Sequence, residues 1–316
     1  ENNNDKTFQN VQKALDDIKQ GNNYDIKRIF NLLQIIICNH HRNEYFFTKI
    51  NKIINYIKED IKQAYSSEDL FDLFFKNNRI LALLIENELI KVNESNIEFL
   101  KSQSNKQYFS AEIYSFHGKN PSQYDSKNRA KYEIYKQKRD IGENDQQLAT
   151  MIRNDSIEEF ITYISKTNSS FDSIIPSSIY ESNPIFLKTQ PNMIQYAVFY
   201  GSMQIINYFI NNNVELNPSL LTYAIHSNCA EMIELLLSKI EINDFNSLII
   251  ESIKCHHNEV ASYLLTNKDS NKSFLKECLD FCNYDFIPVL IDSKPNEKMD
   301  VLQMYDCMTY YPELVN

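Results

Sequence analysis

Glycine is rare in this sequence, which has 4 glycines and 8 prolines among its 316 residues. Sheet proteins and nucleotide-binding folds place glycine in tight turns and phosphate loops, because it adopts positive φ without steric cost and lets a ligand approach the backbone. The shortage argues against both kinds of fold. It favours an all-α fold, whose helices need few glycines.

The sequence also lacks a secretory signal and an apolar run long enough to cross a membrane. Residues 1–20 are polar, and the best apolar stretches, 29–38 and 80–85, fall short of the roughly 20 residues that span a bilayer. The six cysteines show no disulfide-framework spacing, which indicates free thiols in a reducing compartment. We therefore predict a soluble, cytoplasmic protein with no membrane partner.

Positive charge is in short supply, because 32 Lys and Arg residues stand against 42 Asp and Glu residues, for a net charge of −10. An acidic chain disfavours nonspecific binding to nucleic acid. The single basic run, residues 127–139, interleaves Tyr132 and Tyr135 with lysines and arginines. This composition can bind single-stranded nucleic acid. An exposed linker helix is the simpler interpretation. No nucleic acid is expected as a partner, and weak binding through this run is kept as an alternative.

Common catalytic sequences are missing as well. The chain contains no Gly-x-Ser-x-Gly, His-Glu-x-x-His, Gly-x-Gly-x-x-Gly or Walker motif. Acidic pairs such as Glu158 and Glu159 are adjacent, and adjacent residues do not share a helix face. We expect no enzyme activity and no catalytic residue.

Histidine and cysteine gather at two places, residues 38–41 and 255–257. A zinc site needs about four converging ligands, usually from paired motifs with short spacing. Cys278 and Cys282 could share a helix face, but they also fit the repeat pattern described next. The residues of both groups are therefore interpreted as structural, and no metal or cofactor is expected.

Four segments of the C-terminal half share one pattern. Each has an apolar residue, a small residue three positions on, a turn-forming residue four later, and then an apolar pair. The small residues Ala197, Ala224, Ser252 and Cys278 are separated by 27, 28 and 26 positions. Such a period predicts stacked helix pairs, because one pair cannot bury its own apolar face.

Residues 193–217 resemble the ankyrin repeat across nearly the whole unit, from Ile194 and Ala197 through Gly201 to residues 213–217. The usual Thr-Pro opening is absent, and a period of about 27 is shorter than the ankyrin unit of about 33 residues. The resemblance implies compact helix pairs with short loops and reduced β-turn fingers.

The rest of the chain divides by composition. Apolar residues at helical spacing, such as Ile50, Ile54 and Ile57, predict a bundle near the N-terminus. Residues 169–190 are predicted to be an insertion with a short helix at 177–181. The predicted units are listed here in chain order: an N-terminal helical region at 1–118, a polar linker at 119–145, degenerate ankyrin-type repeats at 146–295, and a terminal partial repeat or cap at 296–316. The last unit suggests a piece of a longer protein.

The amino-acid sequences of four segments, at 132–145, 151–160, 178–184 and 251–258, resemble those of a large ankyrin-protein family of flagellate protists. The resemblance extends over about residues 25–295. It implies a helical N-terminal region of unassigned function ahead of the repeats, and an interaction role without a known substrate.

In ankyrin proteins the two positions before the turn glycine face the concave groove. Carried onto this chain, they predict a partner-binding surface. For its aromatic members, packing in the core is an equally supported alternative. The predicted surface consists of Phe199, Tyr200, His226, Ser227, Lys254 and Asp280. We therefore predict a protein–protein interaction module with a protein partner. An alternative is a structural solenoid fragment of a longer protein whose effector domain is missing.

Overall fold

A computed structural model describes residues 2–20, 25–39, 45–103, 105–118, 126–242, 244–266 and 272–293. Three expectations lie outside these residues: the start of the polar linker at 119–125, the terminal cap at 296–316, and any role of His40 and His41. Within the described ranges, the regular elements are helices, with one isolated β-bridge between Ile174 and Asn192. The predicted all-α fold is confirmed.

The N-terminal region packs its helices around a core of isoleucine, leucine and phenylalanine. Ile54, Ile57 and Ile61 are each at most 1% exposed, as their helical spacing predicted. Residues 80–84 of α6 are buried on every side, so α6 lies at the centre of this region. The helices are α1 (Asn2–Gln20), α2 (Ile26–Asn39), α3 (Phe46–Tyr56), α4 (Lys58–Ala64), α5 (Ser67–Phe74), α6 (Asn78–Glu86), α7 (Ile97–Lys101) and α8 (Ser110–Phe116).

Helix α9 (Ser126–Ile141) occupies most of the segment predicted to be a polar linker. Its Arg139 is 3% exposed and donates hydrogen bonds to Glu112 at 2.9 Å and to Glu86 at 2.7 Å. The end of α9 is therefore anchored in the N-terminal region. The interpretation of the basic run as exposed is wrong for Arg139, because two carboxylates compensate its buried charge. The side chains of residues 127–129 and 131 lie outside the described residues.

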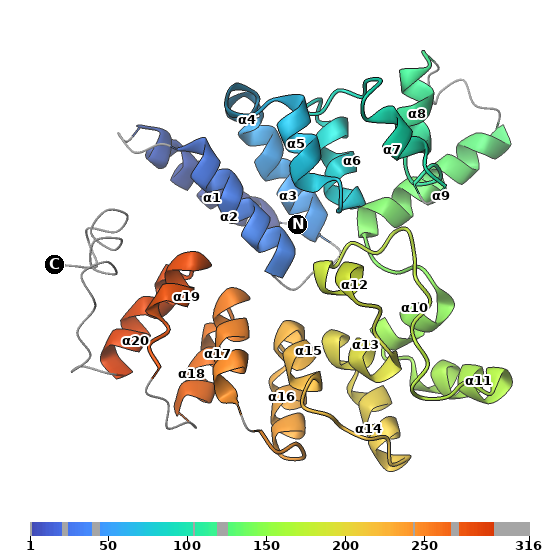
Figure 1. The fold of residues 1–316 in the computed structure, drawn as a ribbon, viewed down its shortest axis with the longest axis vertical. Helices are drawn as coiled ribbons and strands as arrows, with labels where there is room; N and C mark the ends of the chain where they lie inside the picture. The colour runs from blue at the N-terminus through green and yellow to red at the C-terminus, as the bar shows by residue number, and fades with distance from the viewer. Residues whose placement is uncertain are drawn as a thin grey trace.

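The C-terminal half is a stack of helix pairs. Figure 1 shows these pairs as an arc beside the N-terminal helices, with α13, α15 and α17 on the side of that region. Successive first helices of the pairs, α10, α13, α15, α17 and α19, pack against one another. The helices are α10 (Gln147–Arg153), α11 (Ile157–Thr167), α13 (Met193–Tyr200), α14 (Met203–Asn211), α15 (Leu220–Ser227), α16 (Ala230–Leu237), α17 (Phe245–Lys254), α18 (Asn258–Thr266), α19 (Leu275–Asp280), η2 (Tyr284–Phe286) and α20 (Ile287–Ser293).

Each first helix of a pair is followed by one residue with positive φ. These residues are Asp155, Gly201, Asn228, His256 and Cys282, with φ between 50° and 67°. In three of the four predicted repeats, the carbonyl of the small residue then accepts a hydrogen bond from the backbone N–H five positions later, for example Ser202 N to Ala197 O at 2.9 Å. Ala224 O instead accepts from Ser227 Oγ. The four small residues are all 0% exposed, because neighbouring helices pack directly against them. The predicted helix-pair solenoid is confirmed.

The insertion between α11 and α13 folds back over the first pairs. The helix predicted at 177–181 is absent, and α12 (Pro184–Lys188) begins instead at Pro184, whose fixed φ suits the first turn of a helix. Phe186 of α12 packs against Phe199 with ring centroids 4.5 Å apart. Earlier in the insertion, Tyr180 joins the N-terminal core beside Tyr108. The insertion therefore joins the N-terminal region to the stack.

Candidate inter-repeat site

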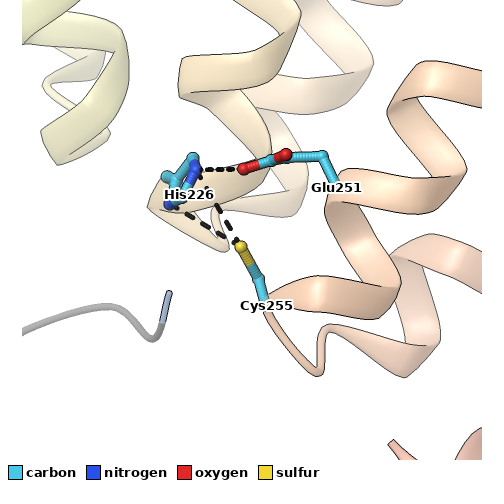
Figure 2. A group of neighbouring side chains, drawn as sticks. All are labelled: His226, Glu251 and Cys255. Carbon is cyan, nitrogen blue, oxygen red and sulfur yellow. Dashed lines mark hydrogen bonds and ion pairs between the residues drawn. The ribbon is translucent and has the colours of Figure 1, made fainter. Parts of the chain in front are cut away.

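Three chemically reactive side chains meet between two neighbouring repeats. His226 comes from α15, Glu251 comes from α17, and Cys255 is the residue directly after α17 (Figure 2). His226 Nε2 lies 2.7 Å from Glu251 Oε1, and Cys255 Sγ lies 3.6 Å from His226 Nδ1 and 4.0 Å from Nε2. His226 is 6% exposed and Cys255 is 0% exposed, so the cluster is almost closed to solvent.

Helix geometry explains why these residues meet. Glu251 and Cys255 are four positions apart, which places them on the same face of α17. His226 stands two positions before the positive-φ residue Asn228, at the end of α15 that faces α17. Because the repeats have nearly equal lengths, the ends of their first helices lie side by side. The two helices thereby bring the three side chains together across one repeat.

Burial, hydrogen bonding and the nearby charge of Lys254 determine the protonation states of Glu251 and Cys255. Burial raises the pKa of Glu251, but the hydrogen bond with His226 and the charge of Lys254 outweigh it and hold the pKa below its usual 4.5. Lys254 Nζ donates to both carboxylate oxygens, at 3.2 and 3.3 Å. Burial, and then the charge of Glu251, raises the pKa of the Cys255 thiol. The cluster thus holds a carboxylate and a protonated thiol.

The order Cys255, His226, Glu251 resembles that of a nucleophile, a base and an orienting carboxylate. A cysteine nucleophile needs a lowered thiol pKa and access to substrate. Cys255 has a raised pKa and no exposed surface. The geometry therefore does not favour cysteine catalysis. The same three donor atoms lie within 4.8 Å of one another and could hold a metal ion.

The six predicted partner-binding residues differ in how far the structure exposes their side chains. Phe199 is 3% exposed, which agrees with its alternative interpretation as a core residue. The expectation of an exposed side chain is wrong for His226, which is 6% exposed. The two rings stack on each other, with centroids 5.6 Å apart, because neighbouring repeats approach closely at this position. Ser227 and Lys254 are half-buried, and Asp280 is exposed.

Tyr200 is held by a polar network that sequence reasoning missed. Its hydroxyl donates to Glu143 and accepts from Asn183 Nδ2 at 3.1 Å, and burial, then the charge of Glu143, raises its pKa well above 10. Glu143 precedes the repeats and Asn183 belongs to the insertion. No repeat pattern links these positions to Tyr200, so only the folded insertion could reveal the contact.

The other histidines and cysteines at the ends of the third and fourth repeats' first helices have structural roles, in turns or in the core. His256 Nε2 donates to Phe281 O at 2.9 Å, and His257 Nδ1 donates to Ile225 O at 2.8 Å. Cys278 is 0% exposed in the core, and Cys282 has the positive φ that ends its helix. The neighbours His256 and His257 therefore point to different repeats, while Cys255 turns to His226.

A second feature lies away from the repeats. A pocket of about 600 Å³ lies between the N-terminal region and α12. Its apolar lining includes Leu73, Phe75 and Leu187, which are 50%, 38% and 44% exposed, and Lys76 and Lys188 also line it. Large exposed apolar side chains around one hollow are typical of binding surfaces.

Comparison with known families agrees with this repeat geometry. A family described as ankyrin repeats matches residues 194–273 in three copies. The matched segment begins in α13 and contains the inter-repeat cluster. Searches of curated proteins and of solved structures returned no match. The C-terminal half thus contains ankyrin repeats. The resemblance to the protist family and the nature of the N-terminal region stay predictions.

Proposed function

We propose that this chain is a protein–protein interaction module that binds a partner on the inner face of its repeats. The observation that carries the proposal is the run of three ankyrin repeats at 194–273, since such repeats are in general interaction modules. Solenoids of this kind present an extended concave surface to their partners. The alternative hypothesis, that the chain is a structural fragment of a longer protein, is compatible with the same binding surface.

The packing shifts the proposed surface toward the C-terminal repeats. Phe186 stacks on Tyr196 with ring centroids 5.1 Å apart and lies 4.5 Å from Phe199, so α12 covers the beginning of the inner face. Beyond it, Lys254 has a side chain 31% exposed, and Asp280 at the end of α19 is exposed. A partner with charges of both signs would match this pair. Ser227, half-buried at the end of α15, completes the proposed surface.

The proposal can be tested by affinity capture followed by titration of the captured protein. We expect Lys254→Ala with Asp280→Ala to weaken binding at least about tenfold, as expected for loss of one or two contact residues of about 1.4 kcal/mol in total. The matched control is Glu231→Ala with Lys239→Ala, which removes the same charges from exposed positions in and after α16. The control should bind like the intact chain.

The pocket beside α12 serves as the competing surface in the same experiment. Leu187→Asp places a charge among its exposed apolar side chains. Loss of the partner in this variant, with full binding by the Lys254 and Asp280 variant, would contradict the inner-face assignment. Nucleic-acid binding through 127–139 has weaker support, because the charge of Arg139 is buried. Steeply salt-dependent retention on an oligonucleotide would revive it.

A further inference from the structure

We propose that His226, Glu251 and Cys255 form a binding site for one zinc-type divalent metal ion between the second and third matched repeats. This inference is independent of the partner proposed above. Their three donor atoms, one nitrogen, one oxygen and one sulfur, lie within 4.8 Å of one another in a buried position. The ion would be bound jointly by α15 and α17.

The donor set selects the class of metal. Thiolate and imidazole ligands favour zinc and related transition metals, whereas calcium and magnesium prefer oxygen ligands alone. One histidine, one carboxylate and one cysteine supply three of the four positions of a tetrahedral zinc site. The side chain of Glu251 is 18% exposed, so water or a partner's side chain can reach the fourth position.

The distances are close to those that a zinc ion requires. Zinc bonds of about 2.0–2.3 Å place tetrahedral ligands about 3.3–3.6 Å apart. His226 Nε2 and Glu251 Oε1 are 2.7 Å apart, and Nε2 and Cys255 Sγ are 4.0 Å apart. The first pair must separate and the second must approach, each by about half an ångström. Metal binding therefore requires the glutamate and the imidazole to rotate.

Two protons must change place when the ion binds. The Cys255 thiol releases its proton to solvent as the metal–sulfur bond forms. His226 Nε2, which donates to the Glu251 carboxylate in the metal-free cluster, must pass its hydrogen to Nδ1 before it can bind the metal. Lys254 Nζ, 3.2 Å from Glu251 Oε1, competes with the ion for the carboxylate. Its side chain is 31% exposed and can move into solvent. Lys254 therefore weakens metal binding without preventing it.

Cobalt(II) added to the metal-free intact chain is the direct probe, because its absorption reports sulfur ligation and four-coordinate geometry. We expect one equivalent to produce a thiolate-to-cobalt band that zinc displaces. Cys255→Ser should abolish the band, and His226→Gln should weaken binding at least about tenfold. Cys229→Ser is the control, since Cys229 is half-buried and lies outside the cluster. It should retain the band.

Lys254→Met gives a test that leaves all three ligands in place. Removing the competing ammonium group should tighten zinc binding several-fold, measured by calorimetry. Unchanged affinity would overturn the proposed geometry. So would a missing cobalt band in the intact chain, or a band that Cys255→Ser preserves. If Cys255→Ser fails to fold, Glu251→Gln takes its place, with the sulfur band expected to persist at lower affinity. Equal affinity in that variant would also overturn the site.

Discussion

The N-terminal region and the repeat stack are held together over different distances along the chain. In the N-terminal region, Arg139 reaches Glu112 and Glu86, which lie 27 and 53 positions away, and Arg79 reaches Asp140, which lies 61 positions away. In the part of the stack from α15 to α20, Asn283 and His226 bond to groups 25 to 30 positions away, which is about one repeat. The first pairs are separated by the insertion, so Ser202 there bonds to Ile152, 50 positions away in the neighbouring pair. The long-range contacts of the N-terminal region meet in the cluster around Arg139 and Glu86. The contacts of the stack join one helix pair to the next.

This difference determines how far the loss of stability caused by a substitution extends through the structure. A solenoid gains its stability from the individual repeats and their nearest-neighbour interfaces, so a lost contact weakens chiefly the adjacent units. The N-terminal region instead buries two arginines in a shared cluster with Glu86 and Glu112. Removing one member of a buried ion group leaves the others uncompensated. We expect cooperative loss in the N-terminal region and local loss in the stack.

The largest effect is expected for Arg139→Met. The substitution keeps a long side chain but leaves Glu112, which is 8% exposed, without its buried partner. We expect a loss of about 3–5 kcal/mol in the free energy of unfolding, measured by urea denaturation. Lys136→Met on the exposed face of α9 is the control and should change little. Adding Glu112→Leu should recover much of the loss. If it recovers nothing, the charge explanation is wrong.

The junction between the regions is expected to be the next most sensitive place. Gly142 has a φ of +70°, and an added Cβ would lie 2.4 Å from Phe47 Cε2 and 2.8 Å from Ser182 Oγ. Gly142→Ala should therefore cost about 2–4 kcal/mol, from backbone strain and overpacking together. Gly118 has the same φ with no atom within 4 Å of an added Cβ, so Gly118→Ala isolates the strain. Equal losses in the two variants would show that the contact with Phe47 is unimportant.

The smallest of the three effects is expected in the stack itself. Asn283 Nδ2 donates to Ile253 O and to Asn258 Oδ1, both at 2.8 Å, from a side chain that is 1% exposed. Asn283→Ala should cost about 1–3 kcal/mol, because the buried carbonyl loses its side-chain donor. Hydrogen exchange should accelerate in α17–α20 and stay unchanged in α6. Asn207→Ala, at an exposed position of α14, should leave both unchanged. Acceleration in α6 would contradict the local behaviour of the stack.

Local patterns predicted the repeats better than the candidate site. The residue types of Ala197 and Gly201 indicate their structural roles, because the first helix of each pair needs a small side chain where its neighbours pack and a positive φ where it ends. The repeat pattern left Phe199 open between surface and core, and it is buried because α12 and its Phe186 cover it. An insertion that folds back leaves no trace in the repeat period. The same holds for the N-terminal bundle. The spacing of its isoleucines predicted helices, but it did not predict which carboxylates pair with Arg139.

The sequence by itself determined the all-α class, the 26- to 28-residue period and the positions of the turns, because these depend on neighbours within about ten residues. The tertiary structure decided which polar side chains meet. His226 and Glu251 are 25 positions apart and come together only when α15 packs against α17. The repeat period predicts that successive helix pairs stack, but contacts between particular side chains depend on the rotation and separation of the packed helices, which the period does not specify.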